Sequence, residues 1–193
     1  YRDSRYFRIG FESSGNFMNL YDKIAGSPQT ESGYNFLGIK YSQYVKFDLE
    51  GTYNRRIDDK NSVVYHAAFG LGVPYGNSDV LPFEKRYFGG GANGVRGWQV
   101  RQLGPGIFDD NSTIYMNKTG DVKLQFNLEY RFKLIWVIEG ALFTDVGNIW
   151  TIRDYNEDQP GGVFRFNTFY QQLALAYGIG ARLDFSFFVF RLD

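Results

Sequence analysis

The residues of this chain that could do chemistry gather in one glycine-rich stretch, residues 82–98, which reads P-F-E-K-R-Y-F-G-G-G-A-N-G-V-R-G-W. Four of the six residues 89–94 are glycine, and glycine lets the backbone enter φ > 0 and approach other surfaces closely. Such a run predicts a loop whose shape other groups must hold. Arg96, near the end of the stretch, could form a fixed salt bridge with a carboxylate elsewhere in the fold.

Other candidate sites lack the partners that their chemistry needs. Gly89, Gly91 and Gly94 fit the pattern G-x-G-x-x-G, but no strand before and helix after them supply the context for phosphate binding. His66 is the single histidine, and alone it cannot build a metal site or a Ser-His-Asp relay. We expect His66 to be a polar residue on the inner face of its strand, and we predict no cofactor.

Composition narrows the class of protein. The chain has 193 residues, with 21 basic and 21 acidic side chains, so no basic excess indicates nucleic acid binding. Cysteine is absent, which excludes a disulfide scaffold and thiolate metal sites. The acidic clusters at 109–111 and 156–158 could hold a surface cation, but such clusters are usually solvated loop tips, and we predict no metal site. No run of about 18 apolar residues predicts a membrane helix, and no signal peptide is visible at Tyr1.

The elements that must position Arg96 are strands. In residues 121–133, D-V-K-L-Q-F-N-L-E-Y-R-F-K, every even position is apolar and every odd position is charged or an amide. This period of two predicts a strand, because successive side chains of a strand point to opposite faces. The alternation recurs, and we predict seven strands near 5–13, 36–56, 62–75, 120–133, 136–150, 171–185 and 187–193, with one short helix at 17–25.

The connections between these strands alternate between short and long. Residues 58–61 are a tight turn, and almost no loop separates the strands near 134 and 186. Long connections span 14–35, 76–119 and 151–170. Tight turns at one end and long loops at the other are typical of a transmembrane β-barrel. A soluble β-sandwich also gives alternating strands. Its strands are usually about five or six residues long, however, whereas several here exceed the 9–11 residues of a membrane-spanning strand.

Several linked motifs resemble one family. The loop that ends in V-R-G-W-Q-V-R-Q-L-G-P-G is similar to the sixth extracellular loop of the BamA/TamA superfamily, with its V-R-G-[FYW] signature. The strand G-D-V-K-L-Q-F-N-L-E-Y-R-F resembles the next strand of that family, and A-L-F-T-D-V-G-N-I-W (141–150) resembles its F-x-D-x-G-x-x-W motif. The sequences of these motifs are most similar to the TamA-like lipoprotein branch of the family. The resemblance covers essentially the whole chain, in order.

The resemblance implies an all-β, antiparallel transmembrane barrel of 16 strands, whose long sixth loop folds into the lumen. About seven of those strands are present, so 1–193 is expected to be the C-terminal part of the barrel domain, including the long loop at 76–119. The family's loop arginine corresponds to Arg96, and the wall carboxylates that it contacts correspond to Glu129 and Asp145. The loop motif itself comprises Gly89, Gly90, Gly91, Val95, Gly97 and Trp98.

The paired carboxylates could also be a general acid and base. An arginine bound to both would hold Glu129 and Asp145 ionised, which favours a latch between loop and wall over an enzyme. The resemblance implies a non-enzymatic assembly factor in the bacterial outer membrane, which aids the folding or translocation of other outer-membrane proteins. The alternative is a protein-secretion pore with the loop as its plug. The implied partners are the lipid bilayer, unfolded client proteins, the remaining barrel strands and periplasmic domains of the same protein.

Overall fold

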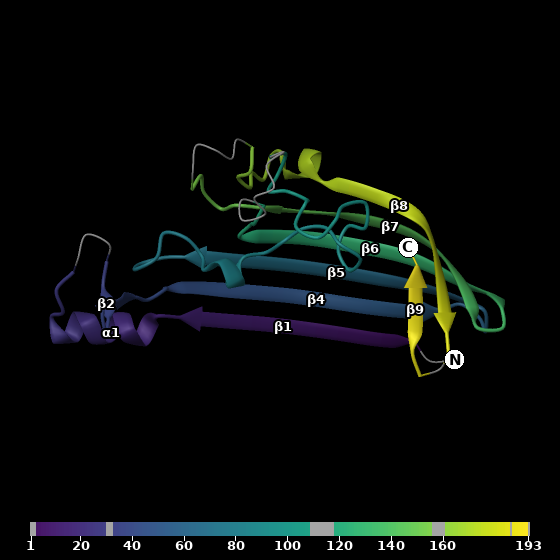
Figure 1. The fold of residues 1–193 in the computed structure, drawn as a ribbon, viewed down its shortest axis with the longest axis horizontal. Helices are drawn as coiled ribbons and strands as arrows, with labels where there is room; N and C mark the ends of the chain where they lie inside the picture. The colour runs from purple at the N-terminus through teal and green to yellow at the C-terminus, as the bar shows by residue number, and fades with distance from the viewer. Residues whose placement is uncertain (1–2, 30–32, 109–117, 156–160, 186, 193) are drawn as a thin grey trace.

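The computed structural model describes residues 3–29, 33–108, 118–155, 161–185 and 187–192. Within these residues the chain forms a seven-stranded sheet in the order β1-β4-β5-β6-β7-β8-β9 (Figure 1). Each strand pairs antiparallel with its neighbour along the chain, which confirms the predicted antiparallel sheet. Its strands are β1 (Ser4–Ser14), β4 (Tyr44–Arg56), β5 (Asn61–Pro74), β6 (Val122–Ile135), β7 (Ile138–Trp150), β8 (Ala174–Asp184) and β9 (Val189–Leu192).

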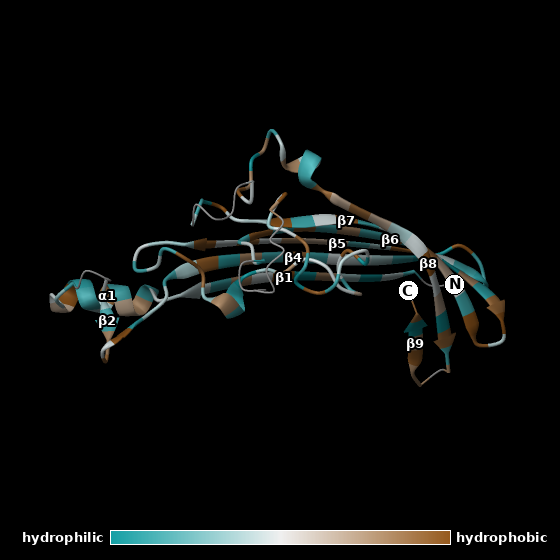
Figure 2. Cartoon of the chain, turned by 45° about the horizontal axis from the view of Figure 1, so that its top comes forward, coloured by the Kyte–Doolittle hydropathy of each residue, from teal (hydrophilic) through white to brown (hydrophobic). Residues whose placement is uncertain are grey.

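The two faces of this sheet differ in polarity, as the alternation predicts. Leu49, Phe69 and Leu124 lie side by side on one face of β4, β5 and β6, which we call the outer face. One residue along, Asp48 pairs with Gly70, and Gly70 pairs with Lys123 on the inner face. The strands in Figure 2 are therefore banded with alternating hydrophilic and hydrophobic residues. Large apolar side chains remain exposed on the outer face, among them Phe7, Ile9, Phe11, Phe126, Leu142, Leu175, Tyr177 and Ile179.

The predicted strand 36–56 is wrong in its first part. The structure has a separate hairpin, β2 (Asn35–Phe36) and β3 (Ile39–Lys40), before β4 begins at Tyr44. Leu37 and Gly38 have φ values of 50° and 80°, so the chain turns back on itself where an extended strand was expected. The helix α1 (Asn16–Ala25) agrees with the expected helix at 17–25. No helix among the described residues is long and apolar enough to cross a membrane.

The strand β8 begins three residues later than the expected strand 171–185. Residues Phe169–Gln172 form a 3₁₀ turn, η3, in place of extended backbone. The indole N–H of Trp150 donates to the Gln172 side-chain oxygen at 2.6 Å, and the Asn148 amide donates to the Gln172 carbonyl. These contacts at the end of β7 hold Gln172 out of the sheet. The last strand is also shorter than the expected 187–193.

Short turns join strands at one end of the sheet and long connections at the other (Figure 1). The Asp58 carboxylate accepts backbone N–H bonds from Lys60 and Asn61, both at 2.7 Å, which closes the β4–β5 turn. The pKa of Asp58 is lowered most by hydrogen bonds from the Asn61 side chain, and these backbone bonds lower it further. Trp136 turns the chain between β6 and β7 with φ of 51°. The long connection after β5 folds back over the inner face of the sheet, where the Tyr87 hydroxyl donates to Asp48 of β4 at 2.7 Å.

We predict that Gly147→Val destabilises the sheet where the loop rests on it. A Cβ at Gly147 would lie 2.6 Å from the Leu124 carbonyl oxygen and 3.3 Å from a Val95 methyl, and the backbone of β6 cannot move away without losing its pairing. We expect the free energy of unfolding of the intact protein to fall by about 1–3 kcal/mol, measured by urea unfolding in detergent. Gly51→Val on β4 is the matched control, since its Cβ would meet nothing closer than 3.7 Å. Equal effects of the two substitutions would contradict the prediction.

Candidate loop-anchoring site

The loop presents Arg96 at the end of a chain of tight turns. The Gly94 N–H donates to the Gly91 carbonyl at 2.9 Å, and the Gly91 N–H donates to the Trp98 carbonyl at 2.8 Å. Gly90 and Gly91 have φ of 84° and 89°, a backbone conformation that residues other than glycine rarely adopt. A Cβ at Gly90 would also lie 2.2 Å from the Gln99 carbonyl oxygen. The glycines are therefore required for the loop to fold tightly enough to present one arginine.

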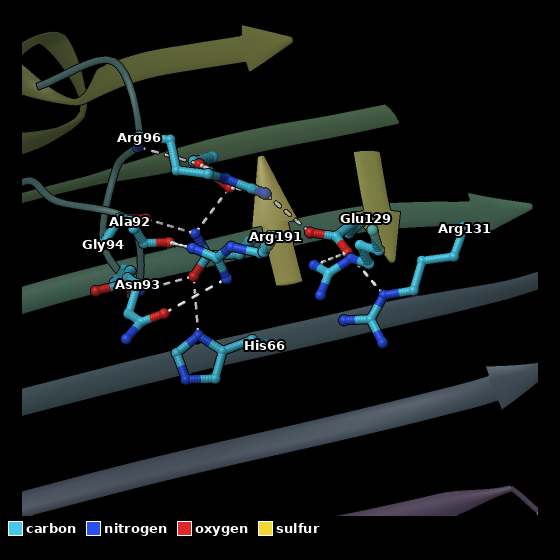
Figure 3. A network of polar contacts seen from close by, with 12 residues as sticks. His66, Ala92, Asn93, Gly94, Arg96, Glu129, Arg131 and Arg191 are labelled. Atoms are coloured by element: carbon cyan, nitrogen blue, oxygen red, sulfur yellow. Dashed lines mark hydrogen bonds and ion pairs between the residues drawn. The ribbon is translucent and has the colours of Figure 1, made fainter. Parts of the chain in front are cut away.

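Arg96 binds both carboxylates that the family resemblance singled out, Asp145 and Glu129, and Figure 3 shows its contact with Glu129. Its Nε lies 2.7 Å and its Nη2 2.9 Å from the two oxygens of Asp145, a bidentate pair, and its backbone N–H donates to the same carboxylate at 3.1 Å. Its Nη1 lies 2.8 Å from Glu129 Oε2. The side chains are 7% exposed for Arg96 and Glu129 and 0% for Asp145. The three charges are thus held together almost out of contact with water.

An aromatic ring completes the arginine's surroundings. The Arg96 guanidinium carbon lies 3.5 Å from the centroid of the Phe143 ring, a cation–π contact. Phe143 stands two residues from Asp145 on the inner face of β7, and its ring fills the space above Gly178 on β8. Burial alone would lower the pKa of Arg96, but its hydrogen bonds to Asp145 and Glu129 raise the pKa above its ordinary value. The arginine therefore stays charged at any physiological pH.

Glu129 is shared by three arginines. Besides Arg96, its other oxygen lies 2.7 Å from Arg131 Nε and contacts Arg182 Nη2. Arg131 lies on the same face of β6, and Arg182 lies on β8. Glu129 therefore links the loop, β6 and β8 by charge-assisted hydrogen bonds, while Asp145 binds only Arg96 among the arginines whose contacts are described.

Asn127 and Gln125 extend the same network, a role that their place on the polar face of the strand did not by itself predict. The Asn127 amide donates to Asp145 Oδ1 and to the Gly94 carbonyl, both at 2.8 Å. Gln125 donates to the Asn93 carbonyl at 2.8 Å. The wall thus holds the loop backbone as well as the arginine. Neighbouring amides two residues apart on a strand that faces a loop would be the signal to look for.

The single histidine lies beside this network. His66 Nδ1 is 2.8 Å from Asn127 Oδ1, and Nε2 is 3.2 Å from Glu50 Oε1. His66 occupies the polar inner face, where the sequence placed it. Within the part of the chain that the structure describes, no three His, Asp or Glu side chains are grouped so that they could hold a metal ion. The acidic clusters at 109–111 and 156–158 lie outside the described residues.

Of the remaining loop-motif residues, Val95, Gly97 and Trp98 pack on the wall, whereas Gly89, Gly90 and Gly91 lie against other residues of the loop. Val95 and Leu103 form a buried cluster with Ala176 of β8, and Trp98 packs against it. A Cβ at Gly97 would lie 3.1 Å from that of Ala176, and a Cβ at Gly89 would lie 2.7 Å from the Leu103 carbonyl. The small residues of β8 therefore leave room for the loop. Residues 89–101 contain turns and bends and no helix, so the G-x-G-x-x-G pattern has no phosphate-binding context.

A glycine-rich loop pinned to the inner wall of a long-stranded sheet is the arrangement that the sequence resemblance implies. Residues 13–193 match the Omp85 superfamily domain. The chain belongs to the Omp85 superfamily. The sequence is 27% identical over 94 residues to the outer membrane protein assembly factor BamA of Neisseria meningitidis serogroup B, a match that covers 46% of this chain and 12% of that protein.

A solved structure shows the same fold. BamA from Haemophilus ducreyi lacking POTRA domains 1–3 superposes with a TM-score of 0.57 and 14% identity, over 95% of this chain and 46% of that one. This likeness supports the predicted fold, an antiparallel β-sheet that forms part of a barrel. The Omp85 chain described here spans less than half of the solved BamA chain and about an eighth of the meningococcal protein.

We predict that Arg96→Ala releases the loop. The substitution strands Asp145 and Glu129 as buried charges with fewer partners, so the free energy of unfolding should fall by about 3–5 kcal/mol. The loop should also become accessible to protease, as seen by cleavage within residues 88–101 of the folded protein. The stability of Arg96→Lys should lie between those of the wild-type protein and Arg96→Ala, because an ammonium keeps the charge but cannot form the bidentate bonds of a guanidinium. Arg165→Ala, at an exposed position, is the control. Unchanged proteolysis and unfolding would rule out the anchor.

We also predict that Glu129→Gln destabilises the protein by repulsion among arginines. The substitution leaves Arg96, Arg131 and Arg182 close together without the carboxylate that they share. We expect a loss of about 3–5 kcal/mol in urea unfolding, of which the second substitution Arg182→Gln should restore part. Glu84→Gln, at an exposed loop position, should change stability little. Additive effects of the two substitutions would show that Arg182 and Glu129 do not interact.

Proposed function

We propose that this chain is the C-terminal part of an outer-membrane β-barrel domain that helps other outer-membrane proteins to fold or insert. The observation that carries the proposal is the buried Arg96–Asp145–Glu129 cluster, which attaches loop residues 91–98 to the inner wall of an Omp85-superfamily sheet. The name of the meningococcal relative, an outer membrane protein assembly factor, supports the same function.

The sheet suits a bilayer. Its strands from β1 to β8 are 11–14 residues long, enough to cross a membrane when tilted. The outer face is apolar and the inner face polar, as in transmembrane barrels. We therefore place the protein in the bacterial outer membrane, with the remaining barrel strands and periplasmic domains supplied by other parts of the same protein.

The proposed mechanism makes and breaks backbone hydrogen bonds and no covalent bonds. An opened barrel edge presents unpaired N–H and C=O groups, which can pair with the edge of an incoming client strand. The pinned loop would keep the inner wall rigid while another part of the barrel opens. Glu129 and Asp145 are both bound to arginine, so neither is free to act as a general acid or base. We propose a non-enzymatic factor without a cofactor. The sequences of its motifs favour the TamA-like branch of the family.

A second function is a protein-secretion pore. It is favoured by the place of the loop, which lies over β5, β6 and β7 on the inner face and would obstruct a channel there (Figure 1). In that case Arg96→Ala should open the pore. Single-channel conductance of the full-length protein in planar bilayers would rise in the variant and stay low with Arg165→Ala.

Depletion in the native cell tests the assembly function. We expect quantitative mass spectrometry of the outer membrane to show a broad fall in unrelated β-barrel proteins after depletion. Wild-type protein and Arg165→Ala should restore them, and Arg96→Ala should restore them only in part. The loss of one secreted protein, with the membrane barrels unchanged, would contradict the assembly function and favour the pore.

A further inference from the structure

The long loop touches the wall at a second place, well away from Arg96. Tyr87 precedes Arg96 by nine residues and is buried against the inner face of β4 and β5. Its hydroxyl donates to Asp48 Oδ1 at 2.7 Å, and the Lys46 ammonium lies 4.4 Å from the centre of its ring. Burial and the bond to Asp48 raise the pKa of Tyr87, so the hydroxyl keeps its proton and remains a donor.

Two glycines of β5 make room for this contact. A Cβ at Gly70 would lie 2.4 Å from the Tyr87 ring, and a Cβ at Gly72 would lie 2.5 Å from a Leu81 methyl. Gly70 and Gly72 are two residues apart, so both face inward and together leave a groove on the wall. Leu81 fills the groove at Gly72, and Tyr87 fills it at Gly70.

Tyr87 also joins the two arms of the loop. Its N–H donates to the Gly120 carbonyl at 2.8 Å, and the Gly120 N–H donates back to the Tyr87 carbonyl at 2.9 Å. The Gly72 N–H donates to the Asp121 carbonyl at 2.7 Å. We call residues 81–87 and 119–121 the stem, and residues 91–98 the tip. The stem is thus a short backbone pair that contacts β5 through the side chains of Tyr87 and Leu81, and its Lys85 ammonium lies 2.6 Å from Glu12 of β1.

Stem and tip are attached to different strands. The tip is held by Glu129 on β6 and Asp145 on β7, whereas the stem contacts Glu12 of β1, Asp48 of β4 and the glycines of β5. None of the contacts described for Tyr87 involves a partner of Arg96. We propose that Tyr87 is a positioning residue that holds the stem of the loop on the wall independently of Arg96, so that the tip can leave its site while the loop stays attached. The functional consequence rests on the proposed assembly function, but the attachment itself does not.

Hydrogen–deuterium exchange of the full-length protein tests the two attachments separately. In Tyr87→Phe the ring stays and the bond to Asp48 is lost, so the stem amides should exchange roughly tenfold faster while the tip amides change less than about twofold. In Arg96→Lys the tip amides should exchange faster and the stem amides should not. Equal acceleration of both regions by either variant would overturn the proposal, and so would unchanged stem exchange in Tyr87→Phe.

Two further pairs of variants separate positioning from general loss of structure. Asp48→Asn keeps an acceptor oxygen and should protect the stem amides better than Asp48→Ala. Gly70→Ala should expel the Tyr87 ring and expose the stem, and Tyr87→Val in the same protein should restore stem protection by making space. Gly51→Ala, which lies in β4 without a loop contact, is the matched control. No recovery in the Gly70 double variant, or equal effects of the two Asp48 variants, would count against Tyr87.

The assembly function and this inference fail differently. Exchange on purified protein reports the attachment alone, whereas the depletion experiment reports assembly. If depletion leaves other barrel proteins unchanged while stem and tip exchange independently, the proposed function is wrong and the two attachments stand. If stem and tip open together in a protein whose depletion does reduce other barrels, the inference about Tyr87 is wrong.

Discussion

The loop-bearing side of the structure depends on removing one arginine and two carboxylates from water at once. An isolated ion of this kind costs several kcal/mol to bury, and only good geometry with its partners offsets that cost. Here the guanidinium forms two bonds with Asp145 and a third with Glu129, and its carbon lies 3.5 Å from the centre of the Phe143 ring. Because one misplaced atom would leave a charge without a partner, the loop backbone and the wall strands are fixed relative to one another.

The sheet supplies the geometry that this ion cluster needs. In the register of β6 and β7, Asn127 lies opposite Asp145, and Glu129 lies opposite Phe143. The two carboxylates are therefore diagonal neighbours on one face, a spacing that one guanidinium can bridge. The glycines of the loop supply the complementary freedom, since the backbone must pass close to Gln99 and Leu103 to bring Arg96 inward. A rigid sheet and a permissive loop are both required.

Much of this could be predicted from the sequence, because alternation is a local property. Strict period-two polarity in 121–133 gave β6 and its inward face, and the same reasoning gave β5 and β7. The strand expected at 36–56 failed because Leu37 adopts a positive φ that its residue type does not announce. The start of β8 was missed because Gln172 is held by Asn148 and Trp150, which precede it by 24 and 22 residues.

The candidate site divides in the same way. The family motif pointed to Arg96, Glu129 and Asp145, and the structure brings these three together. Asn127 and Tyr87 were overlooked, because a polar residue on an inner face and an aromatic in a loop are each common. Their roles depend on which strand lies opposite them, and that information is in the register and not in the residue type.

The order of the residues along the chain has a consequence for how this structure is built. Each strand of the seven-stranded sheet pairs with the next strand of that sheet along the chain, so the sheet can grow one strand at a time. Arg96, however, precedes Glu129 by 33 residues and Asp145 by 49. Its binding site does not exist until β6 and β7 have paired and placed both carboxylates on one face. The ion cluster can therefore form only after β6 and β7 have paired in the correct register.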